Sequence, residues 1–259
     1  MLALNETGIP PDEPVISICF DDGHAMFRTG AADVLKALGI QATLFVVSAC
    51  IGNKHLMWMH ALNAIIQLRG TDRLTESIHR VLERRNLNLE VPSPFALGYA
   101  LAHWPMETKD EIVAEAFDES DMPPMSEFLD EHRPYADWSE LADWISHGHS
   151  VGLHTRTHPF CSRLSADGIE SEIIVPTGEL KSRLEINRVA FAYPFGDRFP
   201  SPEIERDVCE KAGLSAMLGV AGLSRLGTQP WQIDRVDAER GLAIELFGRP
   251  MLRTAAGRA

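Results

Sequence analysis

A short apolar run that ends in two adjacent carboxylates is the feature that most limits how this chain can fold. Residues Val15–Phe20 have the length of a buried strand, and Asp21-Asp22-Gly23-His24 follow directly. Adjacent side chains point to opposite faces inside a strand, but both can reach one cavity where a strand ends. One carboxylate can then bind a metal while the other stays free as a base.

Two later segments carry groups that would complete such a site. His154 and His158 lie four residues apart after a strand-like run, and Tyr193-Pro194-Phe195-Gly196 follows another. His158 precedes Pro159, and a residue before proline avoids the α region, which disfavours a plain surface helix. Alone, an Asp-Asp-Gly segment is typical of a turn, and two histidines four apart can share a helix face. The three segments in this order are more specific than any one of them.

These residue types indicate metal-assisted hydrolysis of an amide or an ester. Three His and Asp side chains commonly hold a divalent metal and leave a position open for water or substrate. Such a metal lowers the pKa of its bound water and polarises a carbonyl, while a free carboxylate takes the proton of the water. Zinc is expected from the ligand types, and other divalent transition metals stay open.

The segments Phe20-Asp21-Asp22-Gly23, His154-Thr155-x-x-His158 and Tyr193-Pro194-Phe195-Gly196 resemble the first three motifs of a known family. The family is the polysaccharide deacetylases with the NodB homology domain, carbohydrate esterase family 4. The resemblance runs from about Val15 to about Val236, with a long interruption. It implies an α/β fold, a distorted (β/α) barrel, and metal-dependent N- or O-deacetylation of a sugar.

The same resemblance implies a role for each residue of the motifs. Asp21 would be the catalytic base, and the backbone N–H of Phe195 would help to stabilise the oxyanion. The metal ligands would be Asp22, His154 and His158.

The chain departs from the family pattern at the arginine of the third motif. In the family this arginine usually pairs with the catalytic aspartate, and Ala192 occupies its position here. Arg235 is the first candidate to replace it, with Arg188 and Arg198 behind it. Each of the three can instead be an ordinary surface cation.

A second departure concerns the general acid. The family supplies a late histidine for this role, whereas no histidine follows His158 in this chain. His24, directly after the Asp-Asp-Gly segment, is within reach of the same site, although a histidine in a turn is more often only solvated. Loss of a positioned acid costs on the order of 10²–10⁴ in rate. A non-catalytic carbohydrate-binding relative therefore stays open as an alternative.

Strands and helices are expected to alternate along one domain that spans residues 1–259. The expected strands are 15–20, 42–47, 150–153, 189–193, 215–220 and 232–236. The expected helices are 30–38, 137–148, 165–185 with an interruption at Pro176, and 201–212. The residues proposed for chemistry follow strands, as they do at the C-terminal rim of a barrel.

Residues 54–136 break this alternation and predict a mostly helical insertion between the second strand and the metal-histidine strand. Apolar residues recur at helical spacing over 56–66 and 74–82, and another helix is expected over 109–117. These apolar stripes are most simply packing surfaces, but the insertion can also form a lid, a substrate wall or a homo-oligomer interface. Packing is favoured over sugar stacking for four tryptophans: Trp58, Trp104, Trp138 and Trp144.

Composition excludes some classes of partner. The net charge of −13 disfavours nucleic acids and anionic membranes, which need a basic surface. Four scattered cysteines form no Cys-x-x-Cys pair and are expected to be buried free thiols. The N-terminus lacks a basic region followed by a long apolar stretch, and no run approaches the roughly 18 apolar residues of a membrane span. We therefore expect a cytoplasmic protein whose substrate is a precursor or a small sugar.

The whole pattern predicts a metal-dependent hydrolase that removes an acetyl or other N-acyl group from an amino sugar or a polysaccharide precursor. Its expected partner is this carbohydrate substrate. Another C–N hydrolase on the same fold, such as a deformylase or a cyclic amidase, would use the same site with a different pocket.

Overall fold

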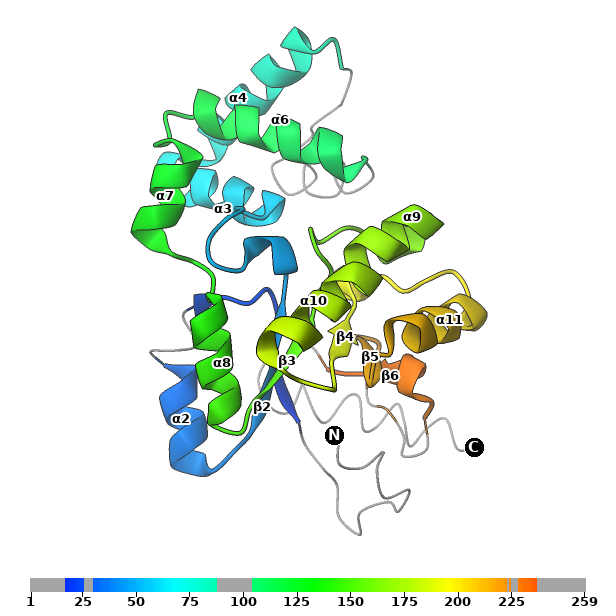
Figure 1. The fold of residues 1–259 in the computed structure, drawn as a ribbon. Coiled ribbons are helices and arrows are strands. Elements are labelled where there is room, and N and C mark those ends of the chain that lie inside the picture. Colours follow the sequence, from blue (N-terminus) through cyan, green and yellow to red (C-terminus); the bar gives the residue numbers. More distant parts are fainter. Residues whose placement is uncertain (1–16, 26–29, 88–103, 223, 225–227, 237–259) are drawn as a thin grey trace, which may run out of the picture.

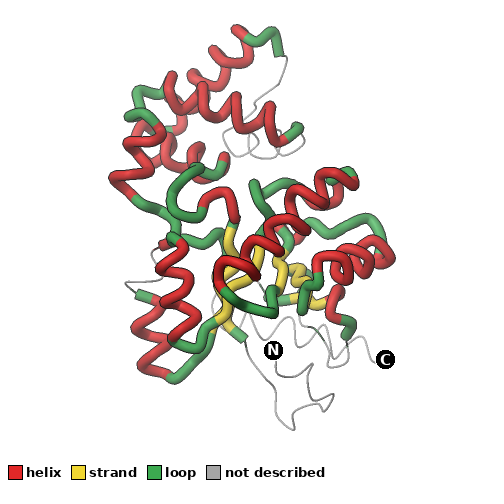
Figure 2. Tube along the Cα trace, in the orientation of Figure 1, coloured by secondary structure: helices red, strands yellow, loops and turns green. Residues whose placement is uncertain are grey.

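Within the part of the chain that the structure describes, six parallel strands form the centre of the fold and pair in the order in which they occur along the chain (Figures 1 and 2). The computed structural model describes residues 17–25, 30–87, 104–222, 224 and 228–236. The strands are β1 (Ile18–Phe20), β2 (Ala42–Val46), β3 (Ser150–Leu153), β4 (Ala190–Ala192), β5 (Ala216–Gly219) and β6 (Ile233–Asp234). Sequential parallel pairing with helical connections is the pattern of a (β/α) barrel, which confirms the expected fold class.

Of the six strands, β3 alone has the expected bounds; β2, β4 and β5 are shorter by one or two residues, and β1 and β6 differ more. Val15 and Ile16, at the start of the expected first strand, lie outside the described residues. The last strand is shorter than 232–236 because a 3₁₀ turn, Pro230–Gln232, directly precedes it. The N–H of Gln232 donates to the carbonyl of Gln229 inside that turn, at 2.9 Å. Gln232 therefore has no part in the sheet.

Helices that cover the sheet begin and end at the residues that their local sequence predicts. The helix α2 (Ala31–Leu38) ends at Gly39, which adopts a left-handed conformation with φ 65°. The helix α8 (Trp138–Ser146) begins with a capping box between Asp137 and Glu140. The helix α11 (Pro202–Ala212) begins at Ser201, whose side chain accepts from a backbone N–H in the first turn. Their apolar faces and the sheet enclose the main core.

The expected interruption near Pro176 takes the form of a π-helical segment that ends two residues before the proline. The helix α9 (Ala166–Ile169) continues through Glu170–Ile174, which is π-helical, into α10 (Val175–Leu184). Pro176 lies in the first turn of α10, where a proline is tolerated. Single π-helical turns recur at functional sites, and this one carries Glu172, which contacts the loop that holds the two histidines.

Four helices within the expected insertion build a second core of their own. They are α3 (Trp58–Arg69), α4 (Thr71–Arg84), α6 (Met106–Glu119) and α7 (Met125–His132), and a 3₁₀ turn, Ser48–Cys50, leads into them. Residues at helical spacing are fully buried between these helices, among them Ile65, Leu74, Ile78, Ile112 and Phe117. Figure 1 shows these helices on the side toward which the carboxyl ends of β2 and β3 point.

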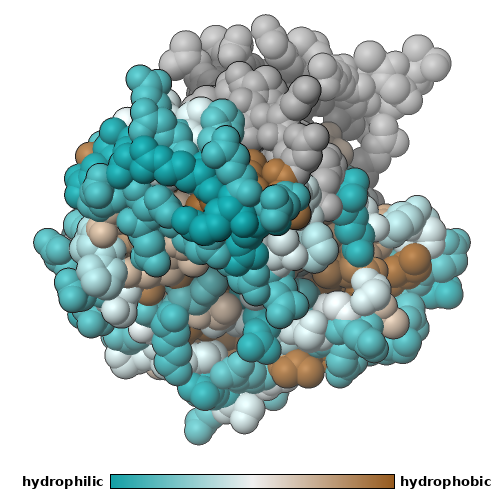
Figure 3. Space-filling model, turned by 90° about the horizontal axis from the view of Figure 1, so that it is seen from above, coloured by the Kyte–Doolittle hydropathy of each residue, from teal (hydrophilic) through white to brown (hydrophobic). Residues whose placement is uncertain are grey.

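The outer face of these helices is mostly hydrophilic where Figure 3 shows it from above. Arginines at the end of α4 pair with glutamates of α6: Arg84, the last residue of α4, reaches Glu115 at 2.8 Å, and Arg85, which follows it, reaches Glu111 at 2.7 Å. Exposed pairs of this kind add little to stability. The expected role of the insertion in a homo-oligomer stays a prediction.

Cysteines and tryptophans occupy the places that the sequence indicates. All four cysteines are free thiols, of which three are buried and Cys19 is partly buried. Trp58 and Trp144 are buried in the two cores, with 1% and 4% of their surface exposed. Within the described residues, no helix combines the length and the apolar character needed to cross a membrane.

Candidate metal centre

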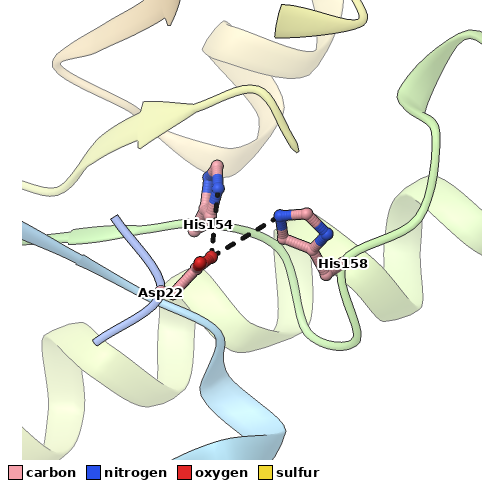
Figure 4. A group of neighbouring side chains, drawn as sticks. All are labelled: Asp22, His154 and His158. Atoms are coloured by element: carbon pink, nitrogen blue, oxygen red, sulfur yellow. Dashed lines mark ion pairs between the residues drawn. The ribbon is translucent and has the colours of Figure 1, made fainter. Parts of the chain in front are cut away.

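The carboxyl ends of four strands bring the predicted site residues together. Asp21 and Asp22 follow β1, His154 and His158 follow β3, Phe195 lies in the turn after β4, and Arg235 directly follows β6. Parallel strands place all their carboxyl ends at one edge, so residues more than 200 positions apart in the chain become neighbours. Figure 4 shows Asp22, His154 and His158 turned toward one another.

Asp22, His154 and His158 have the spacing of ligands that share one ion. Asp22 Oδ1 lies 3.6 Å from His154 Nε2 and 3.5 Å from His158 Nε2. These distances are too long for good hydrogen bonds. Ligand atoms bound at about 2.0–2.1 Å to a tetrahedral ion are roughly 3.3–3.4 Å apart, close to what is seen. Asp22 Oδ1 is also buried and has no hydrogen-bond partner among the described residues. The three side chains fit a divalent metal.

A hydrogen bond on the far side of the ring orients His154. Its Nδ1–H donates to the backbone carbonyl of Ala192, at 2.7 Å, so Nε2 is left as the free ligand atom. The ring is 2% exposed. Ala192 therefore contributes to the site through its carbonyl, although its side chain cannot supply the arginine of the family pattern.

The loop between the two histidines is held by Glu172. Its carboxylate accepts from the backbone N–H groups of Arg156 and Thr157, at 2.9 and 2.8 Å, and from the Thr157 hydroxyl at 2.7 Å. The N–H of His158 donates in turn to the Thr155 hydroxyl, at 2.9 Å. Sequence reasoning missed Glu172, because nothing in its helical neighbourhood indicates that the side chain reaches another loop.

Backbone conformation at the site is unusual for residues with side chains. Asp22, Thr155, His158 and Phe195 all have positive φ, between 59° and 67°. Such conformations cost of order 1–3 kcal/mol each and persist where the surrounding structure imposes them. Four of the nine described non-glycine residues with positive φ lie at these strand ends, so the local strain is concentrated where the ligands are placed.

The charge states of the ligands suit a metal. Burial alone would raise the pKa of Asp22, but the nearby His60, His154 and His158 hold it well below its ordinary value. Burial, with a contribution from His154, lowers the pKa of His158 to about 3. At neutral pH the site therefore offers an ionised carboxylate and an unprotonated imidazole, which are the forms that bind metals.

Asp21 lies beside the three ligands and is held by Arg235. The guanidinium Nη1 and Nη2 of Arg235 donate to Asp21 Oδ1 and Oδ2, at 2.8 and 2.5 Å. Asp21 Oδ2 lies 3.7 Å from His154 Nε2. Burial opposes the charged form of Arg235, but the bonds to Asp21 outweigh it and raise the pKa of the guanidinium above its ordinary value. The pair also joins the last strand to the first.

The two weaker arginine candidates lie elsewhere. Arg198 is engaged by Glu205, at 2.7 Å, and by Asp234, at 3.3 Å. Arg188 is exposed and precedes β4, so it lies at the end of the sheet opposite to the ligands. Of the three arginines, the structure brings Arg235 to Asp21.

Phe195 forms one wall of the site. It lies in a 3₁₀ turn, Pro194–Gly196, and 41% of its surface is exposed. Its ring stacks on Phe160, with centroids 4.5 Å apart, and meets His158 edge to face at 4.6 Å. The residue whose backbone is predicted to stabilise the oxyanion thus packs against His158, a predicted metal ligand.

His24 is placed against the insertion. Its ring lies 4.3 Å from the ring of His60, and its backbone forms a bridge with Tyr135. His60 Nε2 lies 3.4 Å from Asp22 Oδ2, so a residue of α3 reaches the predicted metal ligand. Sequence reasoning missed His60, because the apolar spacing of its helix indicates packing alone. A polar histidine within that apolar run was the one available signal.

Comparison with known proteins agrees with this geometry. The model of the polysaccharide deacetylase family matches residues 8–88 and 98–217, well over half of the chain. The chain belongs to the polysaccharide deacetylase family. Polysaccharide deacetylases are hydrolases of carbon–nitrogen bonds in carbohydrate substrates, and the predicted reaction class is thereby confirmed. Among curated protein sequences, none matches the chain significantly.

Solved structures share the fold at low sequence identity. The deacetylase PplD of Streptococcus pyogenes, in complex with acetate, has a TM-score of 0.57 and 14% identity, covering 96% of this chain and 76% of that one. IcaB from Ammonifex degensii has a TM-score of 0.52 and 18% sequence identity, and the match covers 90% of this chain and 71% of IcaB. A polysaccharide deacetylase from Bacillus cereus has a TM-score of 0.51 and 13% sequence identity, and the match covers 91% of this chain and 51% of that one. At these identities the likeness shows the fold alone.

Proposed function

We propose that this polysaccharide deacetylase removes the acetyl group of an N-acetylated amino sugar by metal-assisted attack of water, with Asp21 as the base. The observation that carries the proposal is that two adjacent carboxylates have different partners. Asp22 faces His154 and His158 through Oδ1, while Asp21 is held by Arg235 at the same opening. Asp22 is thus arranged as a metal ligand, and Asp21 as a base that does not bind the metal.

The chain's own residues would perform most of the steps. A divalent metal held by Asp22, His154 and His158 would supply Lewis-acid polarisation of the substrate carbonyl and activation of water. Asp21 would accept the proton of that water, because its oxygens lie next to the ligand nitrogen of His154. The backbone N–H of Phe195 would donate to the oxyanion as it forms.

We infer zinc as the metal from the donor set. Two imidazoles and one carboxylate, with a position left for water, are typical of catalytic zinc sites. Imidazole donors also suit other divalent transition metals, whose selection depends on geometry and supply. Elemental analysis of the purified protein tests this directly, and an ion other than zinc as the activating metal would contradict the inference.

The proposed function is tested by metal content and acetate release measured on the same preparations. Substrates are N-acetylated oligosaccharides and small N-acetyl amino sugars. Wild type should bind metal and release acetate, Asp21→Asn should keep the metal and lose acetate release, and His154→Ala should lose both. His79→Ala is the matched control, since this histidine is exposed on α4 and should change neither quantity.

The alternatives give different results in the same experiment. Formate release, or ring opening of a cyclic amide, without acetate release would favour another C–N hydrolase on the same fold. Sugar binding that survives Asp21→Asn, with no acyl release from wild type, would favour a binding relative that lacks the general acid. A protein that binds no metal would contradict the site as described.

A further inference from the structure

We propose that the site holds a second divalent cation, bound by Asp22, His24 and His60, so that the Asp22 carboxylate bridges two ions. The inference rests on the proposed function, because the first ion is the one at Asp22, His154 and His158. It adds a ligand from the insertion to the active site of a polysaccharide deacetylase. The three groups offer ligand atoms that all lie within 4.8 Å of one another.

The two oxygens of Asp22 face different pairs of histidines. Oδ1 faces His154 and His158, at 3.6 and 3.5 Å. Oδ2 faces the insertion and lies 3.4 Å from His60 Nε2, close to the roughly 3.3–3.4 Å expected between two ligands of one tetrahedral ion. A carboxylate with a nitrogen ligand at this distance from each oxygen has the arrangement of a bridge between two ions, which in two-metal sites lie about 3.5–4 Å apart.

The hydrogen bonds behind His60 leave its Nε2 available. The ring Nδ1 lies 2.7 Å from the Tyr135 hydroxyl, which also accepts the N–H of Met57, at 3.1 Å. The hydroxyl hydrogen has a further partner in the Cys50 thiol. The hydroxyl oxygen can therefore accept from Nδ1–H, since a phenol accepts two hydrogen bonds and donates one. A partner on the far nitrogen is what orients a metal-ligating histidine.

His24 completes the set from the other side. It follows Asp22 by two residues, and its backbone bridge to Tyr135 fixes the turn against the end of the insertion. The planes of the His24 and His60 rings are tilted by 38°, with centroids 4.3 Å apart. Two imidazoles that are close and tilted can direct one nitrogen each to a common ion, whereas a simple stacked pair would be close to parallel.

Charge predicts the order of binding. The two sites share one carboxylate, and the nearest other carboxylate, Asp21, is paired with Arg235. The first ion neutralises Asp22, so the second gains less Coulombic attraction and binds more weakly. Two binding steps of unequal affinity are expected, with the weaker step depending on His60 and His24.

The test is a zinc titration of the full chain by equilibrium dialysis, with the metal counted by elemental analysis. Wild type should reach two zinc ions per chain, His60→Ala and His24→Ala one, and Asp22→Asn none. The exposed-histidine control His79→Ala should still reach two. With Mn²⁺, electron paramagnetic resonance should show a spin-coupled pair in wild type that is lost in His60→Ala.

Several results overturn the proposal. A wild type that saturates at one ion, or a His60→Ala variant that still binds two, removes the second site and leaves the proposed function intact. If wild type binds one ion and His60→Gln keeps its affinity, His60 only donates a hydrogen bond to Asp22. A wild type that binds none contradicts the proposed function itself. Circular dichroism of each variant confirms that a lost ion does not reflect a lost fold.

Discussion

Replacement of Arg235 by Gln tests whether an arginine directly after β6 performs the task of the arginine that the family pattern places at Ala192, the last residue of β4. The wild-type pair has two charge-assisted hydrogen bonds, at 2.8 and 2.5 Å, each worth about 1.5–3 kcal/mol. The Arg235 side chain is 12% exposed and the Asp21 side chain 33% exposed. Water can therefore replace part of the hydrogen bonding that Asp21 loses in the variant. A net cost of about 2–3 kcal/mol in the transition state corresponds to a fall in kcat/KM of roughly 30–150-fold.

Acetate release at several substrate concentrations measures this change, and zinc content is measured on the same samples. Arg235→Gln should keep its zinc, because the guanidinium bonds to Asp21 and not to a predicted ligand. Arg198→Gln is the matched control. Arg198 pairs with Glu205 and contacts Asp234, the residue before Arg235. Its loss should leave kcat/KM near that of wild type. A folded, zinc-loaded Arg235→Gln variant with kcat/KM within about threefold of wild type would refute the reasoning and leave Arg235 as a structural link between β6 and β1.

Three further predictions concern the surroundings of the site. Glu172→Gln should weaken zinc binding by about 10–100-fold, measured by competition with a chelator, because Gln has one acceptor oxygen for the three donors that Glu172 holds. Lys109→Met should stabilise the fold at pH 7 by up to about 3 kcal/mol, since burial lowers the pKa of Lys109 to about 8. The unfolded chain holds that proton up to about pH 10.5, so the stability of wild type rises with pH between these values and the gain, measured by urea unfolding, shrinks. Trp58→Phe should cost about 0.5–1.5 kcal/mol for its indole bond to the His158 carbonyl, whereas Trp58→Ala should cost about 3–5 kcal/mol; a Trp58→Phe variant as stable as wild type would show that the bond contributes nothing.

Local sequence predicts much of this fold because the signals are themselves local. Helix ends such as Gly39 and the Asp137 capping box need only a few neighbouring residues, and the structure has both. The apolar runs before Asp21 and His154 indicate strands, and parallel strands must place their carboxyl ends together. The candidate ligands can therefore be grouped from the order of the strands alone.

Contacts between distant segments account for what the sequence patterns do not predict. The hydrogen bonds between Arg235 and Asp21 join residues 214 positions apart. The local sequence around Arg235 is equally typical of a surface cation. Glu172 lies in a π-helical segment and accepts from the histidine loop 15 and 16 positions earlier in the chain. Periodicity shows which face of a helix is buried, but not which loop that face meets.

The insertion changes how the site should be understood. Its apolar stripes form a core of their own, as expected, yet its first helix also places Trp58 against the His158 carbonyl and His60 against Asp22. Tyr135, at the far end of the insertion, holds both His60 and the turn that carries His24. A segment that only covered the barrel would not need buried polar groups directed at a ligand, since such groups cost free energy unless they are paired. On the proposed function, the insertion would contribute to the active site, and differences in this segment should alter the metal site and not the substrate wall alone.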